Sequence, residues 1–180
     1  MSPNEDETSY AVFWNETDCI SVNGIASESI SIQEDRRSAE FTFLKGFESA
    51  LYAAYPASVV SKYESGALTL LLPNVQTWSE SDQFDPAAAV MLAQAADGAS
   101  LRFRHAMAYL RVTLSEASDP EPIAAVVLSA NDGSALCGAF QATYGSDLWT
   151  LTPQESAASQ VELRCGTQGA PLGSQMVIAI

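Results

Sequence analysis

The chain has 180 residues, with 8 Lys or Arg against 22 Asp or Glu, so its formal net charge is −14. A chain this acidic repels phosphate, so nucleic acid and anionic membrane surfaces are not expected as main partners. Hydrophobic residues make up 47% and charged residues 17%, a composition typical of a globular protein and not of a disordered one.

The first eight residues are polar and acidic, which predicts a disordered leader over residues 1–8. They contain neither the basic nor the apolar stretch of a secretory signal. The longest purely apolar run, Ala87–Ala93, is far shorter than the about 20 residues that a membrane-spanning helix needs. We expect residues 9–180 to form a single domain.

From about Tyr10 onward, short segments of alternating apolar residues are separated by turn residues, a pattern that predicts β-strands. Asn23-Gly24 is a strong hairpin signal. The segment Leu101–Leu114 fits both helical and strand spacing, and its β-branched residues favour a long strand. The other predicted strands lie around residues 19–22, 29–32, 39–43, 51–55, 68–72, 123–128, 135–140, 161–165 and 176–180.

One segment is predicted to be helical. Asp85 is a good N-cap, Pro86 suits the first helical position, and Ala87–Ala96 supplies strong helix formers. Residues 141–160 are predicted to be loop with a marginal strand near Leu148–Leu151. Many short strands with one short helix indicate an all-β sandwich of antiparallel strands.

The residues that could carry chemistry are few. His105 is the only histidine, and its place in a predicted strand favours a core or near-core histidine over a catalytic base. Three scattered cysteines, Cys19, Cys137 and Cys165, favour small buried side chains over a zinc site, although one disulfide remains open. Solvated turns and a helix cap explain Asp82, Asp85, Asn131 and Asp132 better than a calcium site does. We therefore predict no catalytic residues, no cofactor and no metal.

Two groups of side chains could serve a ligand. Trp14, Trp78 and Trp149 could stack on a sugar, but packing in the core or at its edge is favoured. Arg102, Arg104 and Arg111 hold three of the eight basic charges in one segment, and we expect them to pair with nearby carboxylates on the solvent side of a strand.

An ordered series of short motifs resembles the amino-terminal domain of the fimbrillin family of Bacteroides-type bacteria, which includes the minor-fimbrium-like lipoproteins. The resemblance covers roughly Phe13 to Phe140. Its motifs are, in order, Trp14-x-x-x-Asp18-x-Ile20-x-Val22, Ala39-x-Phe41-x-Phe43, Tyr52-Ala53-Ala54-Tyr55-Pro56-Ala57-Ser58, Leu70-Leu71-Leu72-Pro73-Asn74-Val75-Gln76, Phe84-Asp85-Pro86, Phe103–Val112 and Leu136-Cys137-Gly138-Ala139-Phe140.

The resemblance implies a transthyretin-like β-sandwich in which residues 101–114 are a strand. It implies a non-enzymatic structural or adhesive subunit of fimbriae, a lipoprotein at the cell surface or outer membrane. Its partners would be other fimbrial subunits, joined by donor-strand exchange. Family members usually carry a second β-sandwich domain, so the chain is expected to be the amino-terminal part of a longer protein. The alternative is a surface module of the same architecture that binds a carbohydrate or a host surface protein.

Two candidate sites follow from the resemblance. Fimbrillins of this kind can be cut after an arginine, and Arg36-Arg37, in a polar loop before the Ala39 strand, is the candidate position, although a solvated loop with two charges is the favoured explanation of the pair. The apolar run Met176, Val177, Ile178, Ala179 and Ile180 is the candidate interaction strand.

Overall fold

The structure is a computed structural model, and it describes residues 2–3, 10–11, 13–47, 50–80, 84–96, 100–115 and 121–180. Nearly all of its regular structure is β-strand, interrupted by two short 3₁₀ turns. In chain order the elements are β1 (Ser2–Pro3), β2 (Tyr10–Ala11), β3 (Ser21–Val22), β4 (Ile25–Ala26), β5 (Ser29–Ile32), β6 (Ala39–Thr42), β7 (Leu51–Tyr55), η1 (Ala57–Val59), β8 (Val60–Glu64), β9 (Ala67–Leu72), β10 (Val75–Thr77), η2 (Pro86–Ala88), β11 (Met91–Ala95), β12 (Arg104–His105), β13 (Tyr109–Val112), β14 (Ala125–Ser129), β15 (Gly138–Gly145), β16 (Leu148–Pro153), β17 (Gln160–Arg164) and β18 (Met176–Ala179).

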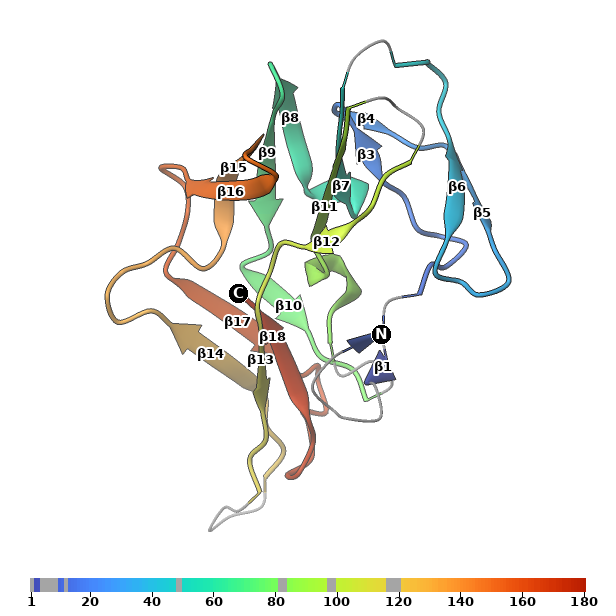
Figure 1. The fold of residues 1–180 in the computed structure, drawn as a ribbon. Helices are drawn as coiled ribbons and strands as arrows, with labels where there is room; N and C mark the ends of the chain where they lie inside the picture. The colour runs from blue at the N-terminus through green and yellow to red at the C-terminus, as the bar shows by residue number, and fades with distance from the viewer. Residues whose placement is uncertain are drawn as a thin grey trace.

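The strands form two layers (Figure 1). In one layer the order β16-β15-β9-β8 makes an antiparallel sheet, and β10-β17-β14 lies below it, where the chain turns from β9 into β10. In the other layer the order is β12-β11-β7-β3-β4, with the pair β13-β18 below it. Among the strands that the structure describes, every pairing is antiparallel except that of β10 with β17. The all-β sandwich predicted from the sequence is confirmed.

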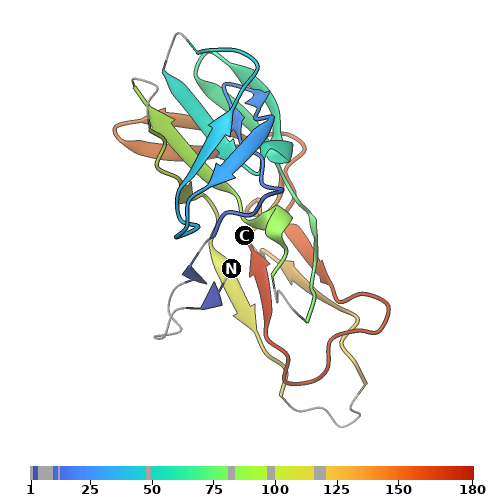
Figure 2. The same cartoon turned by 90° about the vertical axis from the view of Figure 1, so that its right-hand side faces the viewer.

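A third, smaller layer is the β5–β6 hairpin. It packs on the outer face of the five-stranded sheet and crosses in front of it in Figure 2. Along β7, Tyr52 faces the four-stranded sheet, where its ring meets those of Tyr63 and Trp149. Tyr55 faces the opposite side, toward Trp14. Alternation along a strand thus gives the central sheet two covered faces, which is why β7 is buried along most of its length.

The buried side chains form two clusters. The larger fills the space on both sides of the five-stranded sheet, and the smaller lies between β17 and β18. Strand β18 serves both, because Val177 and Ala179 belong to the larger cluster while Met176 and Ile178 belong to the smaller. A strand with two buried faces is expected to be continuously apolar, as this one is.

The first hairpin forms as predicted. Asn23 and Gly24 have φ angles of 49° and 78°, the positive values that a tight two-residue turn between β3 and β4 requires. A side chain at position 24 would meet a second obstacle, because a Cβ there would lie 2.9 Å from the Cβ of Tyr63. Glycine therefore serves both the turn and the close approach of β8.

The predicted helix over Ala87–Ala96 is wrong. Its start signal is genuine, because the Asp85 carboxylate accepts a hydrogen bond from the Ala87 N–H at 2.9 Å and Pro86 opens the turn. The turn stops after Ala88, however, and Met91–Ala95 becomes β11, paired with both β7 and β12. Burial between two strands and two layers overrides the local helical preference of alanine.

Two further segments differ from their predictions. Residues 141–160, expected to be mostly loop, continue β15 to Gly145 and contain β16, joined through Ser146 and Asp147, whose φ angles are 53° and 62°. The long strand expected over residues 101–114 is instead the two short strands β12 and β13. The leader predicted for residues 1–8 falls outside the described residues apart from Ser2–Pro3, which form β1.

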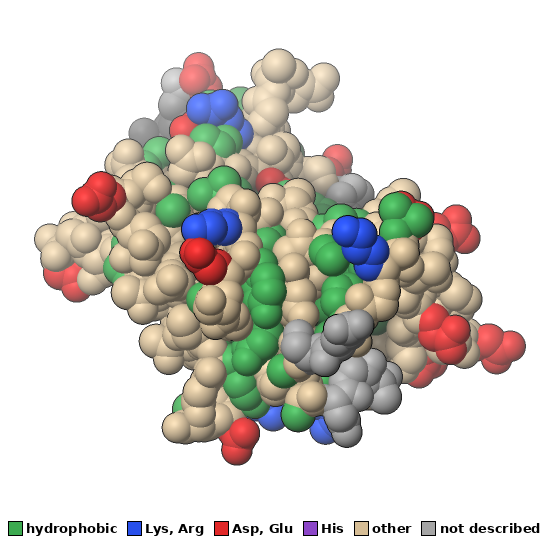
Figure 3. All heavy atoms as spheres, turned by 90° about the horizontal axis from the view of Figure 1, so that it is seen from above, with side chains coloured by type: hydrophobic (Ala, Val, Ile, Leu, Met, Phe, Trp, Pro, Cys, Tyr) green, Lys and Arg blue, Asp and Glu red, His purple; other side chains and the backbone are tan. Residues whose placement is uncertain are grey.

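The surface reflects the acidic composition. Seen from above, the acidic side chains lie mostly around the outline of the molecule and the basic ones are few (Figure 3). Among the described residues, no helix is long and apolar enough to cross a membrane.

Candidate functional site

The β5–β6 hairpin presents one apolar face to the molecule. Ile30, Ile32, Ala39 and Phe41 pack against the main core, and the residues between them are exposed. This is the alternation that the sequence predicts for these strands, and it is confirmed. Within the described part of the chain, β6 pairs with β5 alone, so its second edge carries no strand.

The hydrogen-bond register identifies the groups on that free edge. The Gln33 N–H donates to the Ser38 carbonyl at 3.0 Å, which makes these two residues a hydrogen-bonded pair. Bonded and non-bonded pairs alternate along an antiparallel ladder. From the register Ser31↔Glu40 and Ile32↔Ala39 it follows that Glu40 bonds to β5, whereas Ala39 and Phe41 direct their backbone N–H and C=O groups outward.

A groove of about 920 Å³ runs beside this edge. Its floor is the outer face of the five-stranded sheet, with Ile20, Val22, Leu51 and Met91. One wall is formed by residues 38–41 and 43, which include most of β6, and the opposite wall by residues 100–103. An unpaired strand edge over an apolar floor is the arrangement that accepts an added strand.

Trp14 anchors the hairpin to the sheet at one end of the groove. Its ring makes edge-to-face contacts with Phe41 at 5.1 Å, Tyr55 at 5.5 Å and Phe103 at 5.7 Å between centroids. The Tyr55 hydroxyl donates to the Asp18 carboxylate at 2.9 Å. Burial, followed by the nearby negative charge of Asp18, raises the pKa of Tyr55 well above its usual value.

Arg36 and Arg37, the candidate processing residues, lie in the turn of the hairpin. The Arg36 carbonyl accepts from the Trp14 N–H at 2.8 Å, and the Arg36 guanidinium donates to the Trp14 carbonyl at 3.2 Å and to the Asn15 side chain. The guanidinium also lies over the Phe13 ring. Arg36 is thus held in place, whereas the exposed Arg37 lines the groove.

The candidate interaction strand Met176–Ile180 lies within the fold of its own chain. Met176–Ala179 form β18, which is buried throughout and paired antiparallel with β13. On the second edge of β18, a side chain of the opposite layer forms hydrogen bonds with the backbone. The buried Gln76 amide donates to the Ala179 carbonyl at 2.8 Å and accepts from the Ala179 N–H at 3.0 Å.

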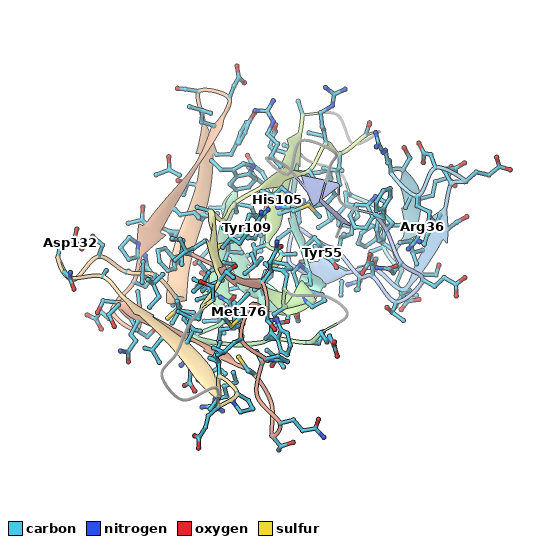
Figure 4. All side chains as sticks on the ribbon, turned by 90° about the horizontal axis from the view of Figure 1, so that it is seen from below. Arg36, Tyr55, His105, Tyr109, Asp132 and Met176 are labelled. Atoms are coloured by element: carbon cyan, nitrogen blue, oxygen red, sulfur yellow. The ribbon has the colours of Figure 1, made fainter. Side chains whose placement is uncertain are left out.

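Figure 4 shows how far apart the labelled residues lie. Arg36 is at one side of the molecule and Asp132 at the other, with His105, Tyr109, Tyr55 and Met176 between them. Of the acidic residues weighed as calcium ligands, Asp132 therefore lies far from the hairpin, and Asp82 falls outside the described residues. Asp132 instead accepts a hydrogen bond from the Ser134 N–H, and Asp85 caps η2.

Of the two alternatives predicted for it, His105 is a near-core residue and not a core one: its side chain is exposed, but its ring contacts Tyr109, which packs against the main core. Its Nδ1 is hydrogen-bonded to the Tyr109 hydroxyl at 2.7 Å, and the two rings meet edge to face. Partial burial of the imidazole lowers the pKa of His105. Burial also raises the pKa of Tyr109, so the Tyr109 hydroxyl stays protonated at neutral pH.

The cysteines and tryptophans occupy mostly packing positions. All three cysteines are free thiols, with Cys137 and Cys165 buried and Cys19 half-buried. Trp14 and Trp78 are only 9% exposed, so neither offers a ring face to a sugar. Trp149 is half-buried and lines a second cavity on the far side of β12.

The sequence predicts the two walls of the groove separately, as the strand around Phe41 and the segment after Leu101. It does not predict that these two segments face each other. The floor residues lie far apart in the sequence, and only pairing of β3, β7 and β11 brings them together. Among the described residues, no group of three or more His, Cys, Asp or Glu side chains could hold a metal ion. No family model, curated protein or solved structure matches the chain.

Proposed function

We propose that this chain is a non-enzymatic structural or adhesive subunit of cell-surface fimbriae that accepts a strand from another subunit. The observation that carries the proposal is the second edge of β6, which pairs with no described strand and borders a groove of about 920 Å³ with an apolar floor. The motif resemblance to fimbrillins supports the fimbrial context and a place at the cell surface or outer membrane.

The groove offers both kinds of contact that strand addition uses. Backbone hydrogen bonds to Ala39 and Phe41 supply affinity for an extended chain. Apolar floor residues such as Val22, Leu51 and Met91 supply sites for every second side chain of that strand. The occupant is therefore an extended segment with apolar residues at alternate positions, donated by another subunit.

Cleavage in the hairpin turn would enlarge this acceptor site. A cut after Arg36 or Arg37 separates β3, β4 and β5 covalently from β6 and everything after it. Strand β3 pairs with β7 at only two positions, Ser21↔Ala54 and Val22↔Ala53. A competing strand could then displace β3 and pair with β7, whose buried residues would line the widened groove.

The apolar run Met176–Ile180 is the candidate donor within this chain. To donate it, one subunit must release β18 from β13 and from Gln76. A synthetic peptide of residues 175–180, with added lysines for solubility, avoids that step and is the appropriate probe.

The test is peptide binding measured by fluorescence anisotropy, before and after limited arginine-specific proteolysis. We expect binding that increases after cleavage. Ala39→Pro removes an outward N–H without breaking a bond to β5, and we expect it to weaken binding at least about tenfold. Ala39→Val keeps the N–H and is the matched control. Absence of binding and a purely monomeric protein, both before and after cleavage, would overturn the proposal.

A further inference from the structure

A second cavity, of about 550 Å³, lies on the other side of β12 from the groove. Three parts of the chain line it: β11 with Gln94, the segment around Arg102 and Arg104, and the β15–β16 turn with Asp147 and Trp149. The volume falls within the range of about 300–1,000 Å³ that is usual for small-molecule sites.

The two arginines outnumber the single carboxylate, Asp147, among the residues that line this cavity. Two other basic residues of the chain are paired: Lys62 with Glu64 at 2.6 Å, and Arg164 with Glu162 at 2.9 Å. Among the described residues, Arg102 and Arg104 form no ion pair or hydrogen bond, so the predicted pairing with nearby carboxylates is wrong for them. Two guanidinium groups that line one cavity without an ion pair favour an anion, even in a chain of net charge −14.

The wall opposite the arginines is aromatic and apolar. Trp149 lies 5.4 Å from the Tyr144 ring and 6.2 Å from the Tyr52 ring between centroids, and these contacts fix its orientation. Leu148, beside it, is 64% exposed. A rigid indole with an exposed apolar neighbour provides the surface against which the CH face of a sugar ring packs.

We propose that this cavity binds a carboxylate-bearing sugar residue, such as a sialic or uronic acid at a glycan end. Arg102 and Arg104 hold the carboxylate, the ring packs on Trp149 and Leu148, and Gln94 and Asp147 bond its hydroxyl groups.

An acidic peptide fits less well than a sugar. Strand addition needs a length of free edge, and β12 comprises only Arg104 and His105. A compact ligand with one negative charge and several hydroxyl groups matches the mixture of guanidinium, amide, carboxylate and indole groups in the wall. The site shares Arg102 and His105 with the groove beside β6, whereas Arg104, Asp147 and Trp149 line this cavity and not the groove. Sugar binding and peptide binding are measured separately, so either proposal can fail without the other.

The test measures binding of sialyllactose, glucuronic acid and lactose to the whole chain by NMR titration. We expect the two acidic sugars to bind and neutral lactose to bind at least tenfold more weakly. The double variant R102Q/R104Q should lose at least tenfold in affinity for the acidic sugars. K62Q/R164Q makes the same change in net charge at exposed ion pairs and should bind as the parent does. Ala39→Pro should also bind sugar normally.

Three results would overturn the assignment: no binding of either acidic sugar, equal binding of lactose, or equal loss in both double variants. Tighter binding of an acidic peptide such as hexaglutamate, with displacement of sialyllactose, would also overturn the assignment. The site would then recognise the charge of a peptide and not a sugar.

Discussion

Gln76 lies on β10, and its buried amide bonds both backbone groups of Ala179 on the facing layer. The amide takes the place that a neighbouring strand would fill on the second edge of β18. Trp78 adds a further contact of the same kind, since its indole N–H donates to the Gln175 carbonyl at 2.9 Å. Together these two side chains hold β18 in register between the two buried clusters.

Replacing Gln76 should therefore destabilise the fold. Gln76→Leu keeps the volume but leaves the Ala179 N–H and C=O without partners, and we expect a loss of about 2 kcal/mol or more in the free energy of unfolding. Urea denaturation measures it. The control is Gln160→Leu, which removes an exposed hydrogen bond to Ser129 and should cost less than about 0.5 kcal/mol. Equal losses in both variants would show that the buried Gln76 amide stabilises the fold no more than an exposed hydrogen bond does.

Tyr55 and Tyr109 make stability depend on pH at the alkaline end. Burial raises the pKa of both hydroxyls above the ordinary value of 10.0, with the Asp18 charge adding to the shift at Tyr55. The unfolded chain thus loses these protons at a lower pH than the folded chain does. The contribution of these two tyrosines to stability is therefore fully present well below pH 10 and is lost as the pH rises through 10 and above.

Urea midpoints between pH 8 and pH 11 test this dependence. The alkaline loss should be smaller in Tyr55→Phe and in Tyr109→Phe, and smallest in the double variant. Tyr144→Phe retains both buried hydroxyls and should lose stability as the parent does. An identical alkaline loss in the parent and the double variant would refute the assignment.

At the scale of the elements, the β5–β6 hairpin determines where an arginine-specific protease cuts the chain. Both arginines are exposed, but Arg36 is held by Trp14 through its carbonyl and its guanidinium, whereas the Arg37 side chain has no hydrogen bond among the described residues. We expect an arginine-specific protease to cut first after Arg37. The two fragments should stay associated in native buffer, because β3 and Trp14 remain packed in the main cluster.

Mass spectrometry of the first products and size-exclusion chromatography of the nicked protein check both expectations. An initial cut after Arg36 would contradict the role assigned to its contacts with Trp14. Immediate separation of the fragments would contradict the packing of β3. Arg37→Gln, which removes the favoured site and leaves Arg36 in place, should slow the first cut.

The elements differ in how far the sequence predicts them. Strands such as β7, β9 and β17 are predictable because their apolar residues and turn residues are local signals. Strand β11 is not, since its alanines and the Asp85-Pro86 start favour a helix and only pairing with β7 and β12 makes it a strand. Strand β8 is polar at Ser61, Lys62 and Glu64 and gives no clear alternation.

At the scale of the whole molecule, both proposed sites arise from contacts between distant segments. The apolar face of β6 follows from its sequence, but the groove exists only because residues near 20, 51, 91 and 101 meet beneath it. Likewise, the sequence shows the cluster of arginines but not that Trp149 lies in the same cavity. In a chain of net charge −14, these two arginines bring positive charge to the cavity.

Amide hydrogen exchange of β6, with and without the peptide of residues 175–180, tests strand addition most directly. In the free protein, Glu40 should be protected by its bond to β5, while the amides of Ala39 and Phe41 exchange fast. On addition of the peptide, Ala39 and Phe41 should become protected and Glu40 should not change. Unchanged exchange at Ala39 and Phe41, or new protection confined to β13, would contradict strand addition at the groove.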